Sequence, residues 1–289
     1  MLVLPVGGCG SVLGKALYSL HDHVVCSSNQ TAFNATVSDS SRHIVADMTE
    51  HTNDIKRQKG LMFTGGVYGH YFQAHLYYHV VTALAQHLQS QGRSETVICE
   101  TGFNAGHSAL LFLSTHPSVR YFGFDLDDPF GWRASGKPHE WASKYAERVL
   151  QRRFPGRVNV TFGDSHKTIV PFFEARPNLK CDIVSVDGDH SFSGVTTDLE
   201  QLEPHLRSGG LIFVDDCNAR DRIKGARSAR AMFEAYASYL TTRGQAARSA
   251  ATALAGILRV EYCPANNNGF CVASKGQCQP VLEGWLRVL

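Results

Sequence analysis

The chain has 289 residues, 43% of them hydrophobic, which is enough to bury a substantial core and excludes a disordered protein. Its 28 basic and 26 acidic side chains nearly cancel to a formal charge of +2, so no strong field attracts a nucleic acid or an anionic membrane. No apolar run approaches the length that a membrane span needs. We therefore expect neither nucleic acid nor membrane among the partners.

The N-terminal part of the chain divides into two predicted segments. Residues 1–58 mix glycine, serine and asparagine with short apolar pieces, which predicts an irregular extension. Residues 59–93 comprise a cap loop and a helix, because the apolar positions from Tyr71 to Gln89 recur with helical spacing. The glycine- and tyrosine-rich loop at 65–71 is a candidate lid over an acceptor. The extension and the helix are also candidate elements of a homodimer interface.

The rest of the chain, residues 94–289, alternates between two kinds of pattern. Short β-branched runs predict strands at 96–100, 120–125, 157–162, 181–187 and 210–215. Amphipathic runs predict helices at 107–114, 139–153, 166–174, 194–206 and 226–240. This alternation predicts an α/β fold with a doubly wound, mostly parallel sheet whose strands end at one ligand-binding edge. Two further runs, 257–263 and 270–274, predict a closing antiparallel hairpin and bring the sheet to seven strands.

The first predicted strand joins its helix through small residues and a carboxylate, from Glu100 through Gly102 and Asn104 to Gly106. Glycine in such a turn lets a ligand approach the main chain, although a merely compact connection carries glycines equally well. The next strand ends in Asp125, about twenty residues later, where an acid that binds ribose hydroxyls belongs. A solvated loop acid is the alternative. The two features together predict a nucleotide site, a dinucleotide site included.

Acidic residues and a histidine follow the last two parallel strands. Asp187-Gly188-Asp189-His190 ends one strand, and Asp215-Asp216 ends the next. Neighbouring parallel strands lie about 4.8 Å apart, so these carboxylates would repel one another unless they were protonated or bridged by a cation. Oxygen ligands favour magnesium, calcium or manganese over zinc. The simpler alternatives are that Asp189 caps the following helix, that Asp216 forms a turn and that His190 is a satisfied histidine.

In this order, the motifs resemble those of class I S-adenosylmethionine-dependent methyltransferases over roughly residues 94–275. The resemblance rests on the Glu100–Gly106 turn, Asp125, Gly163-Asp164-Ser165, and the two acidic strand ends. Within that superfamily, the segment from Asp187 to Phe192 is similar to macrolide-sugar O-methyltransferases and the related cephalosporin hydroxylase-like group. The resemblance implies a Rossmann-like sheet and makes residues 94–289 the cofactor-binding catalytic domain.

The resemblance also assigns roles to individual residues. It implies that the turn surrounds the methionine part of the cofactor, that Asp125 binds the ribose, and that the Gly163–Ser165 segment meets the adenine. The implied cofactor-binding residues are Glu100, Gly102, Phe103, Asn104, Gly106, His107, Ser108, Asp125, Asp164, Ser165 and Asp187. The implied metal ligands, with magnesium favoured, are Asp187, Asp215 and Asp216. His190 stands where metal-dependent members have their base, whereas Asp216 replaces the asparagine of catechol-type enzymes.

We therefore predict metal-assisted O-methylation of a small-molecule hydroxyl, with His190 and Asp187 as the catalytic residues. N-methylation of a small amine is the first alternative, because an amine needs deprotonation but no metal. The hydroxylase-like branch of the same fold is the second. A cofactor-binding protein without turnover is the third, although such a protein has no need for the complete set of acids together with His190.

Cysteines and glycosylation triplets bear on the compartment. Three of the eight cysteines, Cys99, Cys181 and Cys217, lie in or beside predicted core strands, where a reduced thiol packs as a small apolar side chain. The Asn-x-Thr triplets begin at Asn29, Asn34 and Asn159. The third lies in a predicted buried strand, and the first 20 residues make a poor signal peptide. We predict a cytoplasmic protein, with the secretory pathway as the alternative.

Overall fold

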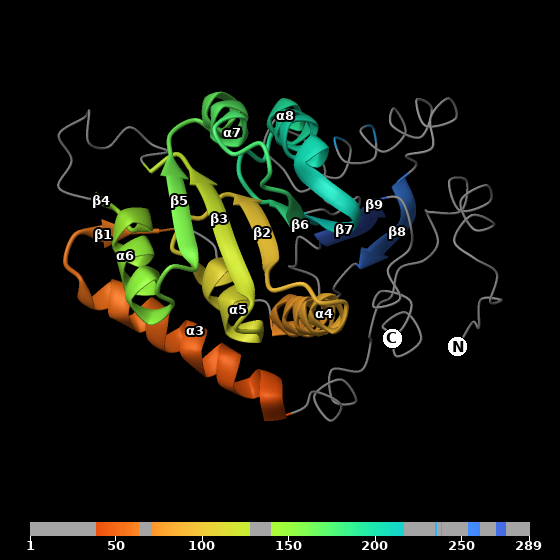
Figure 1. The fold of residues 1–289 in the computed structure, drawn as a ribbon. Coiled ribbons are helices and arrows are strands. Elements are labelled where there is room, and N and C mark those ends of the chain that lie inside the picture. The colour runs from red at the N-terminus through yellow and green to blue at the C-terminus, as the bar shows by residue number, and fades with distance from the viewer. Residues whose placement is uncertain are drawn as a thin grey trace.

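The computed structural model describes residues 39–63, 71–127, 140–216, 254–260 and 270–275, with the single positions 235 and 238. Within these ranges, a seven-stranded sheet lies between two layers of helices (Figure 1). The predicted lid at 65–71 lies outside the described residues except for its last position, and the predicted helix at 226–240 lies outside them except for positions 235 and 238. Of the described helices, none has the length and apolar character required to cross a membrane.

The sheet has the strand order β5-β3-β2-β6-β7-β9-β8. Its parallel strands are β2 (Thr96–Thr101), β3 (Val119–Asp125), β5 (Val158–Phe162), β6 (Cys181–Val186) and β7 (Leu206–Asp215). Strands β8 (Leu254–Val260) and β9 (Phe270–Lys275) pair antiparallel with each other, and β9 pairs antiparallel with β7. The predicted α/β fold with a mostly parallel sheet is therefore confirmed.

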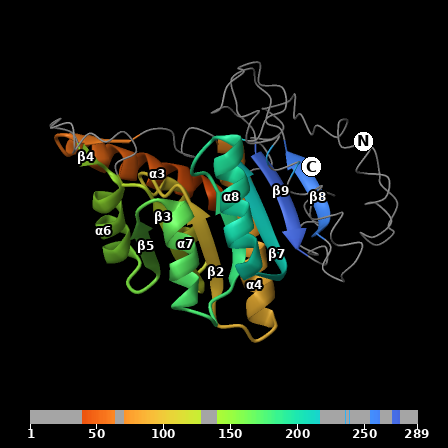
Figure 2. The same ribbon diagram turned by 90° about the horizontal axis from the view of Figure 1, so that it is seen from above.

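The helices cover both faces of the sheet (Figures 1 and 2). One face carries α3 (Asp39–Arg57), α4 (Tyr71–Ser90), α5 (His107–Thr115) and α6 (Ser143–Arg153). The other carries α7 (Ser165–Glu174) and α8 (Phe192–Leu202). Two separate clusters of buried apolar side chains result, one on each face, because successive residues of a strand point to opposite sides. A two-stranded parallel pair, β1 (Leu61–Met62) and β4 (Glu140–Trp141), lies beside the α6 end.

Helix α3 corrects the prediction of an irregular N-terminal extension for residues 39–57. Ile44, Met48 and Ile55 are fully buried, and they form a narrow apolar stripe at helical spacing. Two polar residues continue the buried face. The Nε2 atom of His51 lies 2.7 Å from the Ala105 carbonyl oxygen. The Oγ1 atom of Thr52 donates to the Met48 carbonyl over 2.8 Å. The helix is amphipathic, but few of its residues are apolar and polar residues complete its buried face, which is why the segment does not stand out in the sequence.

Most other boundaries agree with the sequence to within a few residues. The predicted helix 194–206 ends at Leu202, because Pro204 interrupts it in a short 3₁₀ turn (η2, Glu203–His205). Strand β7 then begins at Leu206, four residues before the predicted start. The predicted helix 139–153 begins at Ser143, since residues 140 and 141 pair as β4.

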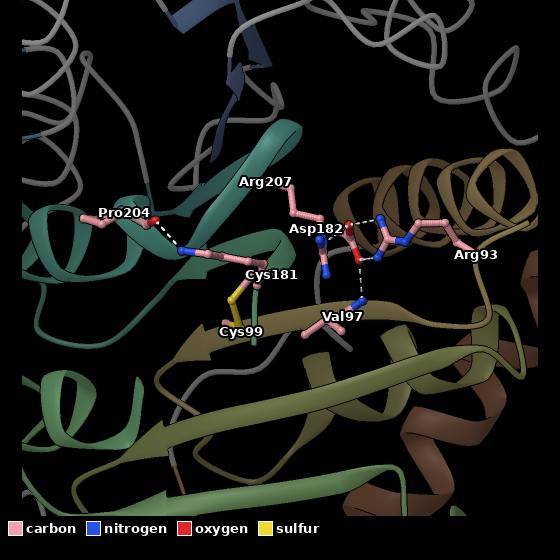
Figure 3. Close-up of a disulfide and its surroundings, with 8 residues drawn as sticks. Arg93, Val97, Cys99, Cys181, Asp182, Pro204 and Arg207 are labelled. Carbon is pink, nitrogen blue, oxygen red and sulfur yellow. Dashed lines mark hydrogen bonds and ion pairs between the residues drawn. A yellow bond between two sulfur atoms is a disulfide. The ribbon is translucent and has the colours of Figure 1, made fainter. Parts of the chain in front are cut away.

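Two details of the strands contradict the sequence-based expectations. Cys99 and Cys181 form a disulfide between β2 and β6, so they do not pack as reduced thiols (Figure 3). Asn159 is exposed, because β5 is an edge strand on which Val158 and Val160 point inward and the residue between them points out. Cys217 lies outside the described residues.

Candidate active site

A pocket opens at the carboxyl edge of the parallel strands, between β2, β6 and β7 on one side and α4 on the other. Its lining comprises Gln73, Tyr77, Glu100, Gly102, Phe103, Asn104, His107, Ser108, Ser185, Asp187 and Asp215. Seven of the eleven predicted cofactor-binding residues are in this lining, and so are two of the three predicted metal ligands, Asp187 and Asp215. The pocket therefore joins the two features that the sequence presents separately, the turn after β2 and the acids after β6 and β7.

The turn after β2 depends on Gly102. Its φ of +89° lies in the left-handed region that side chains disfavour. A Cβ atom at this position would lie 2.0 Å from the Asp187 carbonyl oxygen, so the glycine lets two main-chain segments meet. The Asp187 amide also donates to the Thr101 carbonyl over 3.0 Å. The close approach that the sequence suggests for a ligand is thus made by the main chain of Asp187, a predicted catalytic residue.

Glu100 lies beneath this turn and is 1% exposed. Its Oε2 atom accepts hydrogen bonds of 2.5 Å from the Ser108 and Tyr121 hydroxyls, and Oε1 accepts one of 2.9 Å from Ser185. Burial raises the pKa of Glu100 to about 7, against the lowering effect of these donors. Both carboxylate oxygens accept hydrogen bonds from the protein, so the side chain stabilises the turn as well as lining the pocket.

Asp125 and the turn are tied together, although Asp125 is not in the pocket lining. Its Oδ2 atom accepts from the Asn104 amide over 2.7 Å, and Oδ1 accepts from the Asp127 amide over 2.8 Å. Burial raises the pKa of the Asp125 carboxyl, and the two amides lower it. The side chain is 8% exposed. Its predicted contact with ribose stays a prediction.

The remaining predicted cofactor residues make local contacts. Gly106 has a φ of +73° at the start of α5, where a Cβ atom would lie 2.9 Å from Leu150. Asp164 caps α7 by accepting from the His166 amide over 3.1 Å. Ser165 donates to the buried Asp198 carboxylate over 2.9 Å. These residues shape the edge of the sheet, and their predicted contacts with the cofactor stay predictions.

The acids and the histidine at the ends of β6 and β7 form one cluster. Val186 and Val214 are paired in register, which places Asp187 and Asp215 next to each other beyond the strands. His190 bridges two carboxylates, with Nε2 at 3.2 Å from Asp187 Oδ1 and Nδ1 at 3.1 Å from Asp216 Oδ2. The predicted convergence of these residues is confirmed by the geometry, with the imidazole between two of the acids.

Electrostatics in the cluster follow from burial and mutual repulsion. Burial and the charge of Asp215 raise the pKa of Asp187 well above its ordinary value. The pKa of Asp215 rises to about 6, through burial and then the charge of Asp216. Burial alone would lower the pKa of His190, but its two carboxylate partners raise it to about 11. The imidazole is therefore positively charged at neutral pH, and it partly neutralises the acids.

Comparison with known proteins identifies the family to which this site belongs. Residues 99–217, which span β2 to the end of β7, match a protein family described as a methyltransferase domain. The chain contains a methyltransferase domain. The resemblance to class I S-adenosylmethionine-dependent methyltransferases is thereby confirmed. A comparison with curated proteins finds no match.

Solved structures share the fold of this methyltransferase. An O-methyltransferase from Bacillus cereus in complex with SAH is 12% identical, with a TM-score of 0.53, over 84% of this chain and 99% of that chain. TomG, an O-methyltransferase from Streptomyces achromogenes involved in tomaymycin synthesis, is 12% identical in its complex with SAM, with a TM-score of 0.50, over 87% and 96% of the two chains. A protein from Corynebacterium glutamicum is 16% identical, with a TM-score of 0.53, over 87% and 97%. At these identities the likeness establishes the fold.

Three pocket residues of the methyltransferase are absent from the sequence-based assignment. Gln73 and Tyr77 lie four residues apart on α4, and so share one face of that helix. Gln73 donates to Asp215 over 2.6 Å, and Tyr77 stacks on Phe213 with ring centroids 4.5 Å apart. Ser185 lies two residues before Asp187, on the same side of β6. The alternation of β6 is a signal that identifies Ser185, whereas helix periodicity cannot say what α4 faces.

His107 lines the pocket and is hydrogen-bonded to helix α3. It is 3% exposed, and its Nε2 atom lies 2.8 Å from the Thr52 hydroxyl of α3. Burial lowers its pKa to about 3, so the ring is neutral at physiological pH. Helix α3, which the sequence presents as irregular, therefore helps to fix one wall of the pocket.

The predicted metal site has a donor set of three carboxylates, Asp187, Asp215 and Asp216. Among the described residues, no group of three or more His, Cys, Asp or Glu side chains is arranged to hold a metal ion. The chemistry of the cluster nevertheless fits a hard cation, because Asp187, Asp215 and Asp216 are acids that repel one another. The charged imidazole of His190 already lies between two of them.

Proposed function

We propose that the protein transfers the methyl group of S-adenosylmethionine to a hydroxyl oxygen of a small molecule. The observation that carries the proposal is that one pocket is lined both by the glycine turn and by the acids Asp187 and Asp215. In this arrangement the turn holds the methionine portion of the cofactor. The acceptor hydroxyl lies toward the cluster, in line with the sulfonium methyl, and this alignment removes much of the entropy cost of encounter.

Proton removal falls to the cluster. In its neutral form, His190 takes the proton of the acceptor hydroxyl, and Asp187 and Asp216 hold its ring in place and stabilise the imidazolium that results. A divalent cation held by Asp187, Asp215 and Asp216 would lower the pKa of the acceptor hydroxyl. It would also offset the negative charge of these carboxylates, and so lower the pKa of His190. Magnesium is the favoured ion for an all-oxygen ligand set.

A methyl-transfer assay tests the proposal. The full chain is incubated with methyl-labelled S-adenosylmethionine and a panel of sugars, phenols and amines, with magnesium or with excess EDTA. We expect label on oxygen, dependence on magnesium, and a product that mass spectrometry identifies as a methyl ether. Full activity in excess EDTA would show that the reaction needs no divalent cation. Label on nitrogen would move the assignment to N-methylation. Cofactor binding detected by calorimetry, without label on any acceptor, would favour a role without turnover.

A further inference from the structure

A glycosylation triplet is displayed on the surface of the edge strand β5. Asn159 is exposed, whereas its neighbours Val158 and Val160 are 8% and 9% exposed and pack into the core. Thr161, the third residue of the triplet, is half-buried, and it lies on the same face as Asn159 because side chains two apart in a strand point the same way. Of the described residues, those at 159–161 are the only ones that form an Asn-x-Thr triplet.

The position of Asn159 keeps a large substituent away from the pocket. In the parallel sheet, Asn159 pairs with Phe122, whereas Phe162 pairs with Asp125 at the pocket edge. Three residues of strand separate the two levels, or about 10 Å. β5 is also the outermost strand on its side of the sheet, so no further described strand covers it. An oligosaccharide attached here would project from the edge and leave the cofactor turn accessible.

A second observation, independent of the triplet, concerns the redox environment. Cys99 and Cys181 are fully buried and form a disulfide that joins β2 to β6, near the centre of the sheet (Figure 3). The bond closes a loop with a sequence separation of 82 residues. Disulfides of this structural kind persist in oxidising compartments and are rare in the cytosol. The same compartments contain the machinery for N-glycosylation.

We propose that Asn159 is an N-glycosylation site and that the chain folds in an oxidising secretory compartment, not in the cytoplasm. The Asn159 amide nitrogen forms a bond to the anomeric carbon of a lipid-linked oligosaccharide. The bond from that carbon to the lipid pyrophosphate breaks, the pyrophosphate leaves, and the amide proton passes to a base. The Cys99 and Cys181 thiols lose two protons and two electrons to an oxidoreductase disulfide, which becomes a dithiol.

The glycan would also protect the fold. An exposed edge strand presents unpaired backbone groups to other chains, and proteins commonly block such edges. A bulky polar substituent on Asn159 hinders edge-to-edge pairing at β5. This modification is separate from the proposed reaction, since Asn159, Cys99 and Cys181 are not among the residues that line the pocket.

Peptide mapping of the secreted chain tests the proposal. The full chain is produced through the secretory pathway of insect cells with Asn29→Gln and Asn34→Gln, because those two triplets lie outside the described residues. Amidase release of glycans in heavy-oxygen water converts a glycosylated Asn159 to labelled Asp. We expect the label in this background and its loss in Asn159→Gln and Thr161→Ala. Thr161→Ser is the matched control and keeps the label, because serine also completes the triplet.

A second measurement determines whether Cys99 and Cys181 are joined by a disulfide. An unreduced digest of the same secreted protein should contain a linked peptide pair with Cys99 and Cys181, and the chain made in a reducing bacterial cytoplasm should contain both thiols and unfold at a lower temperature. An unmodified Asn159 in folded secreted protein would overturn the glycosylation site. Both cysteines alkylated without reduction in that protein would overturn the compartment. Methyl transfer by the unglycosylated variant separates either failure from a failure of the proposed reaction.

Discussion

The two halves of the pocket differ in how their polar groups are satisfied. The turn after β2 is buried, and the Glu100 carboxylate at its base accepts from three hydroxyls of the protein. In the cluster after β6 and β7, the side chains of Asp187 and His190 are each 32% exposed. The two form an ion pair, so the charge of each is stabilised by the other. A site for binding can be completed by the fold alone. A site for proton transfer keeps exposed groups whose charge state depends on what binds.

The largest effect is expected where the two halves touch. Gly102→Ala adds a Cβ atom 2.0 Å from the Asp187 carbonyl oxygen, so we expect a loss of unfolding free energy above about 4 kcal/mol and loss of cofactor binding. Gly92→Ala is the matched control. Gly92 has a φ of +83° but no atom within 4 Å of the added Cβ, so it should cost about 1–2 kcal/mol.

Denaturant unfolding and calorimetry with S-adenosylmethionine measure both variants. Equal losses for Gly102→Ala and Gly92→Ala would mean that only backbone strain matters. The close contact between Gly102 and the Asp187 carbonyl would then contribute nothing to stability or to cofactor binding.

The next effect separates chemistry from binding. His190→Ala removes the group that bridges two acids, and we expect kcat to fall by about 10²–10⁴-fold. The dissociation constant for the cofactor should change little. His116→Ala is the control, because His116 is also hydrogen-bonded, to Ser118 over 2.8 Å, but lies at the opposite end of the sheet. A His190→Ala enzyme with normal turnover would remove the proton-transfer role from the cluster.

A smaller effect is expected at the helix that faces the cluster. Gln73→Leu deletes the 2.6 Å hydrogen bond to Asp215, a charge-assisted contact whose loss corresponds to about tenfold or more in rate. Since Gln73 lowers the pKa of Asp215, its removal should raise that pKa further and shift the acidic limb of the rate profile to higher pH. Gln89→Leu, at an exposed position of α4, is the control. An unshifted limb together with a lower rate would indicate a packing role for Gln73.

The sequence predicts the strands well because their apolar runs are short and their ends are marked by glycines and acids. Gly102, Asp187 and Asp215 were identified from this punctuation alone. Contacts between strands that are not consecutive in the chain could not be predicted. β2 and β6 are neighbours in space but separated by β3 and β5 in the chain, so the pairing of Cys99 with Cys181 requires the folded sheet.

Helices show the same limit. Periodicity predicts that one face of α4 is buried, but it cannot say that Gln73 meets an acid from β7. In α3 the apolar stripe is so narrow that His51 and Thr52 complete its buried face through polar contacts with α5 and with the helix itself. A polar side chain with a tertiary partner has no signature in the composition of its own segment.

The last effect concerns stability, not rate, and its dependence on pH in the buried half of the pocket. The pKa of Glu100 is about 7 in the fold, against an ordinary 4.5, so its protonated form is the one that folding favours. Its contribution is fully present below pH 4.5 and is lost as the pH rises through 7, by at most on the order of 3 kcal/mol. Glu100→Gln should flatten the stability curve across this interval. Glu95→Gln, whose side chain is 47% exposed, should leave the curve unchanged. If wild type and Glu100→Gln give parallel urea midpoints from pH 4.5 to 7, then Glu100 is ionised throughout, and the turn is held by an anion.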